Sequence, residues 1–357
     1  MLMTQNFSTQ KYFVLSIFLL SLMAILIDDI MTFSIDHSND PLHCSSLPPS
    51  EDKRNRTSKI PTLQDLVSTR GSAVVSCPQG NLPINSKPIS NTSHLLVSMK
   101  KYKIPFQIHQ TVKTRCVTPE VHALMKSWQD LGIPYYLHDD HSMDALILSE
   151  ASDAFPQLKI IWKQCLGVPA AKADLWRMLL LWTYGGIYAD IDAKPVSFNP
   201  LFHILPNDDM YTMSDNDGLP SFHFIAAIPR HPLLFLTIQH GLELVLQVSD
   251  VGSYNPARHT GPKALKKAMR SFIRGTYDAN NTQHQNIQSK VANFTFLGMG
   301  GYTLRREGPP EHSNRVVMEC ALPNKRQNYQ RFAMRHYSDG VKMNQSCLEA
   351  LFNYTRK

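Results

Sequence analysis

The sequence predicts an α/β domain with a mostly parallel central sheet over residues 101–357, preceded by an N-terminal membrane helix and a stem. Three observations support this prediction. Segments typical of strands and helices alternate between residues 104 and 192, as in βαβ units. A run of sixteen uncharged residues lies near the N-terminus, and a polar, proline-bearing stretch separates it from the predicted domain.

The uncharged run, residues 12–27, is predicted to be a transmembrane signal anchor. It is short for a bilayer span of about 20 residues, but thin early-secretory membranes accept shorter spans. Lys11 precedes the run and favours a cytosolic tail over residues 1–11. A cleaved signal peptide and a buried core helix are the alternatives; the sequence after Ile25 is a poor cleavage site. The signal anchor and the cleaved peptide both place the rest of the chain in the secretory lumen, with the Golgi or ER membrane as the expected location.

Residues 28–100 are predicted to be a lumenal stem, because their polar, proline-bearing stretches offer little to bury. Part of 60–77 is expected to pack back on the domain as a helix. All six cysteines follow the uncharged run. They permit up to three disulfides, whose pairing the sequence leaves open. Six Asn-x-Ser/Thr sites in the same part of the chain fit a lumenal glycoprotein.

Nucleic acid is not an expected partner, although the net charge is +7. The excess is spread along the chain, and no basic cluster is interleaved with aromatic residues. The densest basic segment, 263–270, is predicted to be the solvated face of an amphipathic helix, with a nucleotide-diphosphate cleft as the alternative.

Element signals follow one another along the predicted domain. Pro119 suits the first turn of a helix, and Gly185 suits a helix C-cap. The expected strands lie at 104–110, within 132–140, at 187–191 and at 222–228, and the expected helices at 119–130, 143–150, 171–184, 232–248 and 263–273.

The segment from Ala171 to Asp192 carries the strongest chemical signal. On a strand ending at this point, Asp190 and Asp192 would face the same way, roughly 7 Å apart at the Cα atoms. Paired carboxylates suit a hard divalent cation, which can also hold a diphosphate. In α/β sheets ligands bind beyond the carboxyl ends of the strands. The sequence therefore predicts a metal and diphosphate site there.

Asp174 and Arg177 lie three residues apart on the preceding helix and can pair. They fall on a different stripe from the apolar residues expected to face the core. A surface ion pair worth a few tenths of a kcal/mol is one interpretation. Their position one helix upstream of the paired aspartates favours the other, in which both line the site.

The combination Ala-Asp-x-x-Arg, seven residues, then Gly-Gly-x-Tyr-x-Asp-x-Asp resembles glycosyltransferase family 32, which includes initiation-specific α-1,6-mannosyltransferases and inositol phosphorylceramide mannosyltransferases. A lone Asp-x-Asp is a weak signal, but the combination is specific. Further resembling segments extend the likeness over roughly 104–270; they lie at 104–113, 127–140, 227–233 and 260–265. Val112 stands where the family usually has Trp.

The resemblance implies a GT-A fold, a Mn²⁺ or Mg²⁺ ion, a nucleotide-sugar donor and retention of anomeric configuration. By position in the motif, Asp192 would bind the metal, and Asp190 would contact the ribose and the metal shell. Asp174 and Arg177 would hold the donor sugar. Asp190, Asp192 and Arg177 are therefore the predicted catalytic residues.

Ile108, His109 and Gln110, at the end of the first strand, would lie near the nucleobase and ribose by the same resemblance. His336 is the candidate third protein ligand of the metal, although the usual Trp after it is missing and a surface histidine is the alternative. His231 precedes Pro232 and is expected to start a helix.

The favoured hypothesis is a membrane-anchored retaining transferase that moves mannose from GDP-mannose to a glycan. Transfer to inositol phosphorylceramide and a UDP-sugar-dependent galactosyl- or N-acetylglucosaminyltransferase are the alternatives within the class. A lumenal carbohydrate-binding pseudo-enzyme and a metal-dependent hydrolase are the alternatives outside it. The intact polar motif argues against the pseudo-enzyme. Asp215 and Asp217 are expected in an acceptor-side or simply solvated loop.

Overall fold

The computed structural model describes residues 60–68, 77–84, 100–113, 115–214, 220–248, 254–274, 294–307, 318–320 and 347–348, all within a compact unit that spans Thr57–Lys357. The predicted signal anchor at 12–27 and most of the predicted stem lie outside the described residues. His336 and the loop that carries Asp215 and Asp217 lie outside them too. Within the described ranges, no helix is both long and apolar enough to cross a bilayer.

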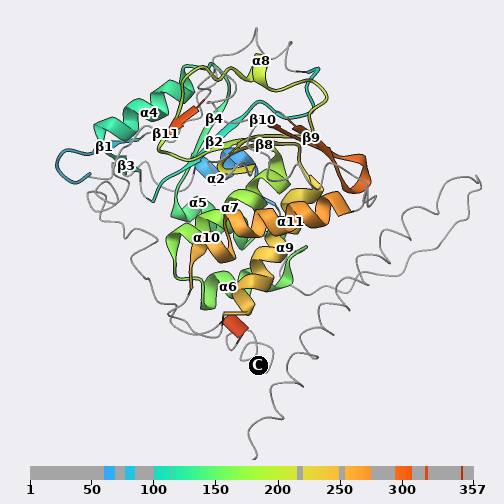
Figure 1. Ribbon diagram of the computed structural model, residues 1–357. Helices are drawn as coiled ribbons and strands as arrows, with labels where there is room; N and C mark the ends of the chain where they lie inside the picture. The colour runs from blue at the N-terminus through green and yellow to red at the C-terminus, as the bar shows by residue number, and fades with distance from the viewer. Residues whose placement is uncertain are drawn as a thin grey trace, which may run out of the picture. The chain divides into compact units, whose positions relative to one another are not determined.

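The centre of the domain is a seven-stranded sheet with the order β4-β2-β5-β8-β7-β10-β9 (Figure 1). Its strands are β2 (Ile108–Thr111), β4 (Tyr135–His138), β5 (Gly186–Ala189), β7 (Met210–Ser214), β8 (Pro220–Ala227), β9 (Phe294–Leu297) and β10 (Thr303–Glu307). The two-stranded pairs use β1 (Leu82–Pro83) with β3 (Cys116–Val117), and β6 (Ala193–Pro195) with β11 (Met318–Cys320).

The central sheet is mixed, which corrects the expectation of a mostly parallel one. The pairs β2–β4, β2–β5 and β7–β10 are parallel, whereas β5–β8, β7–β8 and β9–β10 are antiparallel. Strand β8 follows β7 after a connection of only residues 215–219. A short connection joins antiparallel neighbours, while parallel neighbours need a crossover of a dozen residues or more.

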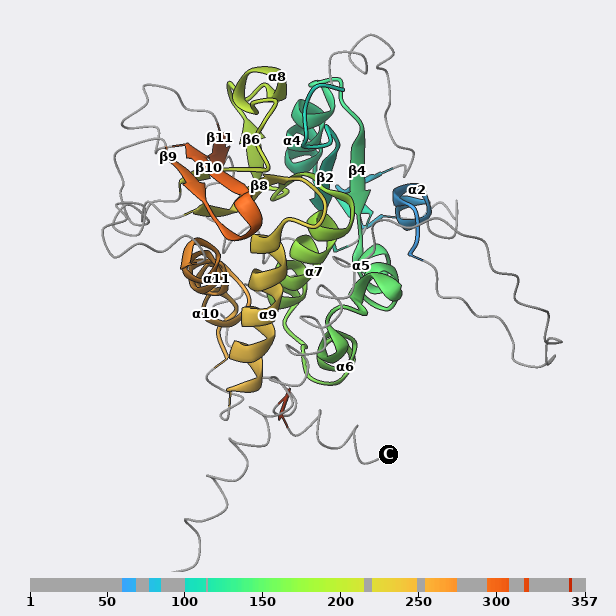
Figure 2. The ribbon, with the colours of Figure 1, turned by 90° about the vertical axis from the view of Figure 1, so that its right-hand side faces the viewer.

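Helices cover both faces of this sheet. They are α2 (Leu63–Val67), α4 (Pro119–Gln129), α5 (Asp140–Ile147), α6 (Pro156–Gln164), α7 (Pro169–Tyr184), α8 (Pro200–His203), α9 (Pro232–Leu246), α10 (Pro256–His259) and α11 (Pro262–Arg274), with 3-10 turns at Glu150–Ser152 and Met299–Gly301. Helix α9 packs against both α7 and α11 below the sheet in the view of Figure 1, and α4 lies on the other side of the sheet (Figures 1 and 2). The α4 side chains Val121, Met125 and Trp128 join a core with Ile108 and Phe224 from the sheet.

Part of the predicted stem packs on the domain. Leu66 and Val67 of α2 are buried, and α2 contacts α5 and β4 beside the edge of the sheet (Figure 2). A disulfide joins Cys77 to Cys116, and β1 pairs with β3 next to it. The helix expected within 60–77 is therefore present as α2, and the compact unit begins before residue 101.

Most expected elements are present with shifted ends. Helix α7 is buried nearly all round, and the stripe that carries Asp174 and Arg177 is buried as well. The reason is that α7 lies between the sheet and α9–α10 rather than at the surface. Gly185 and Gly186, with φ of 65° and 105°, make the turn from α7 into β5, a backbone that glycine adopts readily. A Cβ on Gly186 would lie 2.8 Å from the carbonyl oxygen of Gln107.

Candidate functional site

Asp190 and Asp192 lie in a turn at the carboxyl end of β5, not on the strand itself. Strand β5 ends at Ala189, and the backbone N–H of Ala193 donates to the carbonyl of Asp190 at 3.0 Å, which closes the turn. The prediction that Asp190 and Asp192 end the strand expected at 187–191, with their side chains on the same face, is therefore wrong. The turn arises because the chain leaves β5 and enters β6 at Ala193, and it still brings both carboxylates to the sheet edge where ligands bind.

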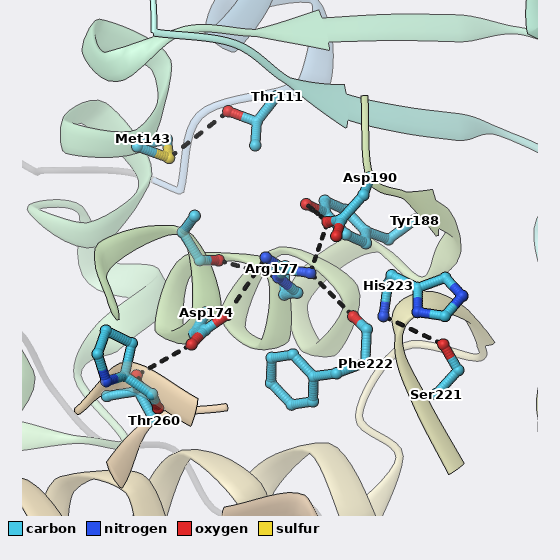
Figure 3. Close-up of polar contacts among 12 residues, drawn as sticks. Thr111, Met143, Asp174, Arg177, Tyr188, Asp190, Ser221, Phe222, His223 and Thr260 are labelled. Carbon is cyan, nitrogen blue, oxygen red and sulfur yellow. Dashed lines mark hydrogen bonds and ion pairs between the residues drawn. The ribbon is translucent and has the colours of Figure 1, made fainter. Parts of the chain in front are cut away.

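Arg177 joins α7 to this turn (Figure 3). Its guanidinium Nη1 donates to Oδ1 of Asp190 and to the carbonyl of Phe222, each at 2.8 Å, and Nη2 lies 3.2 Å from Oδ1 of Asp174. The guanidinium also stacks over the ring of Tyr188, at 4.5 Å from its centroid. Only 8% of the Arg177 side chain is exposed, so the surface ion pair considered from the sequence is wrong.

The charges around Arg177 are strongly coupled. Burial by itself lowers the pKa of Arg177, but Asp190, Tyr188 and Asp174 raise it well above its ordinary value. Burial raises the pKa of Asp174 to about 7, against the opposing effects of Arg177 and Thr260. The arrangement therefore keeps a permanent cation between two carboxyl groups.

Asp174 is held from its other side by the turn between α10 and α11. The hydroxyl of Thr260 donates to Oδ2 of Asp174 at 3.0 Å. A Cβ on Gly261 would lie 3.0 Å from the same oxygen, so glycine lets this turn approach the carboxyl group. The segment at 260–265, one of those that resemble the family, therefore contributes Thr260 to the site.

The predicted nucleoside-contacting residues of β2 are all buried. Ile108, His109 and Gln110 each have no exposed surface. Ile108 belongs to the core that includes the buried side chains of α4. Nδ1 of His109 lies 3.2 Å from Nε2 of His138. Burial lowers the pKa of His109 to about 3, against an opposing effect of the Gly185 backbone. Their role as donor contacts stays a prediction.

The paired aspartates fit a divalent cation that is shared with a ligand. The Asp190 side chain is 27% exposed, and Asp192 is partly exposed. A cation such as Mg²⁺ is commonly held by one or two carboxylates together with substrate phosphates and water. Across the described ranges, no group of three or more His, Cys, Asp or Glu side chains could hold a metal by itself. Two carboxylates and a bound diphosphate together would supply oxygen ligands of this kind.

Tyr188 is a site residue that sequence reasoning did not assign. Its hydroxyl donates to Oδ1 of Asp190 at 2.8 Å, so Oδ1 accepts from both Tyr188 and Arg177. The Tyr-x-Asp spacing is the sequence signal for it, because on the strand expected at 187–191 residues two apart would face the same side. The carbonyl of Phe222, by contrast, belongs to a strand distant in sequence and carries no sequence signal.

The other acidic pair, Asp208 and Asp209, is structural. Asp208 makes a bidentate pair with Arg305, and Asp209 accepts from the backbone and hydroxyl of Thr303 and from Lys103. Both aspartates are buried. His231 likewise caps α9, as its position before Pro232 predicts: Nδ1 accepts from the backbone N–H of Leu233.

The segment that contains this motif matches a known protein family. Residues 110–210 match the family of glycosyltransferase sugar-binding regions containing a DXD motif. This match confirms the resemblance stated from the sequence, and it includes Asp174, Arg177, Asp190 and Asp192. Residues 110–210 are therefore similar to a glycosyltransferase sugar-binding region, and Asp190-Ile-Asp192 is a DXD sequence within the matched residues.

A search of curated proteins finds no match to the chain. Among solved structures, the chain is similar to the PaToxG glycosyltransferase at 18% identity, with a TM-score of 0.39, over 55% of this chain and 82% of that one.

Proposed function

We propose that this protein is a retaining, metal-dependent glycosyltransferase of the GT-A class that transfers mannose from GDP-mannose to a glycan. The observation that carries the proposal is the Arg177 guanidinium held between Asp174 and Asp190 beside the DXD turn. A buried, permanently charged fork of donors suits sugar and phosphate oxygens, and the family match covers the same residues.

In the proposed reaction, the chain's own groups bind and orient the donor. Arg177 fixes Asp190 through Oδ1, and Asp174 and Arg177 would hold sugar hydroxyls. A Mn²⁺ or Mg²⁺ ion on Asp190 and Asp192, when bound, would neutralise the departing diphosphate. Because these groups are already held by hydrogen bonds, little reorganisation is needed when charge develops.

The proposal includes a site of action in the secretory pathway, on the lumenal side of the Golgi or ER membrane. Two disulfides, Cys77–Cys116 and Cys165–Cys347, support it, since disulfides form and persist in oxidising compartments. The sixteen uncharged residues at 12–27 would anchor the chain in the membrane.

The test is turnover by the full-length chain in detergent, with Mn²⁺ and a panel of GDP- and UDP-sugars, measured as nucleotide release. Asp192→Asn should abolish release, whereas Asp209→Asn, in the structural acidic pair, should retain it per folded molecule. Release from GDP-mannose alone supports the full proposal. Release from a UDP-sugar would overturn the donor, and no binding of any donor by a folded chain would overturn the proposed activity.

A further inference from the structure

The backbone of the DXD turn is held at both of its ends by side chains from other elements. Nε2 of Gln110, at the end of β2, donates to the carbonyl of Asp190 at 3.1 Å. Nε1 of Trp128, on α4, donates to the carbonyl of Ala193 at 2.8 Å. Between these points, the turn's own bond joins the N–H of Ala193 to the carbonyl of Asp190 at 3.0 Å. Asp192 lies inside the span that these contacts enclose.

The orientation of the Gln110 amide is determined by its partners. The carbonyl of Asp190 is an acceptor, so the amide NH₂ must face it. Oε1 therefore faces Tyr135, whose hydroxyl donates to it at 2.7 Å. Burial raises the pKa of Tyr135 above its ordinary value, which keeps that hydroxyl protonated. Gln110 has no exposed surface, so water does not compete for these bonds.

Trp128 is equally constrained. It has no exposed surface, and its ring packs against Phe198 and Phe224, at 5.9 Å and 6.3 Å between centroids. The indole N–H is a donor only, and the carbonyl of Ala193 satisfies it. This buried hydrogen bond links α4 to the backbone at the end of the DXD turn.

We propose that Gln110 and Trp128 are positioning residues that hold the turn Asp190–Ala193 and thereby set the affinity of the DXD carboxylates for a divalent cation. This inference rests on the proposed metal-dependent function. The physical reason is preorganisation: a turn already held in the binding geometry loses less conformational entropy when a ligand binds. Without the two donors, the carboxylates would occupy the binding geometry in a smaller fraction of molecules, and the observed affinity would fall in proportion to that fraction.

The experiment measures the Kd of Mn²⁺, with saturating GDP, from the electron paramagnetic resonance signal of free Mn²⁺. The variants are Trp128→Phe, which keeps an aromatic ring and removes the N–H, and Gln110→Glu, which keeps the shape and removes the amide donor. Trp162→Phe is the matched control, because Trp162 on α6 is also buried and donates to Asp144 on α5 at 2.7 Å rather than to the turn. Losing one such hydrogen bond is expected to raise the Kd about threefold to tenfold.

The outcomes separate the inference from the proposed function. A Kd raised about threefold or more in Trp128→Phe and Gln110→Glu, but not in Trp162→Phe of similar melting temperature, supports the positioning role of Gln110 and Trp128. A Kd within twofold of wild type in both folded variants would overturn it while leaving the metal-dependent function intact. A wild-type chain that binds no Mn²⁺ with either GDP or UDP would overturn both.

Discussion

Replacing Arg177 with Lys tests whether one guanidinium organises the site. The ammonium of Lys keeps the charge but is a compact donor that lacks the planar fork. From one position it cannot reach Asp190, the carbonyl of Phe222 and Asp174 together, all of which Arg177 contacts within 3.2 Å. The variant should therefore lose at least one charged hydrogen bond and leave a buried carboxylate poorly paired.

The magnitude follows from those contacts. A hydrogen bond to a charged group contributes about 1.5–3 kcal/mol, so Arg177→Lys is expected to destabilise the fold by about 3 kcal/mol. For a compact unit of about 300 residues, that corresponds to a melting temperature lower by roughly 5 °C. Donor turnover should fall by about 100-fold or more, because the ligand-facing groups lose their common support.

The matched control is Arg305→Lys. Arg305 also pairs with a carboxylate, Asp208, donates to a backbone carbonyl, that of His203, and stacks over a tyrosine ring at 4.3 Å. It lies on β10, outside the site. Thermal unfolding should report a similar loss in both variants, while turnover per folded molecule should fall only in Arg177→Lys. Equal turnover in the two variants would refute the reasoning.

Three further predictions follow from the described contacts. Asp190→Asn should reduce donor turnover about 100-fold or more by weakening cation binding, while Asp209→Asn should mainly lower the melting temperature; comparable turnover losses would contradict this. Burial lowers the pKa of His231 from 6.5 to about 4. The neutral imidazole therefore contributes fully to the free energy of unfolding above pH 6.5, and about 3 kcal/mol of that contribution is lost as the pH falls towards 4. Urea unfolding across this range should show a smaller loss of stability in acid for His231→Asn, which keeps a helix cap. The double variant Cys165→Ser/Cys347→Ser, which removes a cross-link between residues 182 apart in sequence, should lose up to about 5 kcal/mol in thermal unfolding. Reduction of the wild type, which also breaks Cys77–Cys116, should lower the melting temperature at least as far, and an unchanged melting temperature in the variant would count against the cross-link.

Local signals predicted most elements and the motif itself. Pro119 starts α4 as expected, after Thr118 as its N-cap, and Gly185 ends α7. Val121, Met125 and Trp128 recur in α4 at helical spacing, and all three are buried. The motif spacing brought Asp174, Arg177 and Asp190 into one hypothesis, and the structure brings them into contact. These features depend on neighbours in sequence, so sequence reasoning reaches them.

The direction of β8 and the shape of the DXD turn were decided only in three dimensions. Side-chain alternation does not reveal the direction of a strand, so the sheet was expected to be mostly parallel. The turn differs from the predicted strand because Ala193 pairs with β11 through Cys320, more than 120 residues away along the chain. Local propensity carries no information about such a partner.

By itself, the sequence determined the α/β class, the positions of most helices, and the set of charged residues that meet at one sheet edge. Only the tertiary structure decided how those residues are used: Arg177 buried between two carboxyl groups, Thr260 supporting Asp174 from a distant turn, and Gln110 and Trp128 holding the backbone around Asp192. The physical reason is that hydrogen bonds and burial depend on distance in space, and contacts between separate elements leave no periodic pattern in the chain.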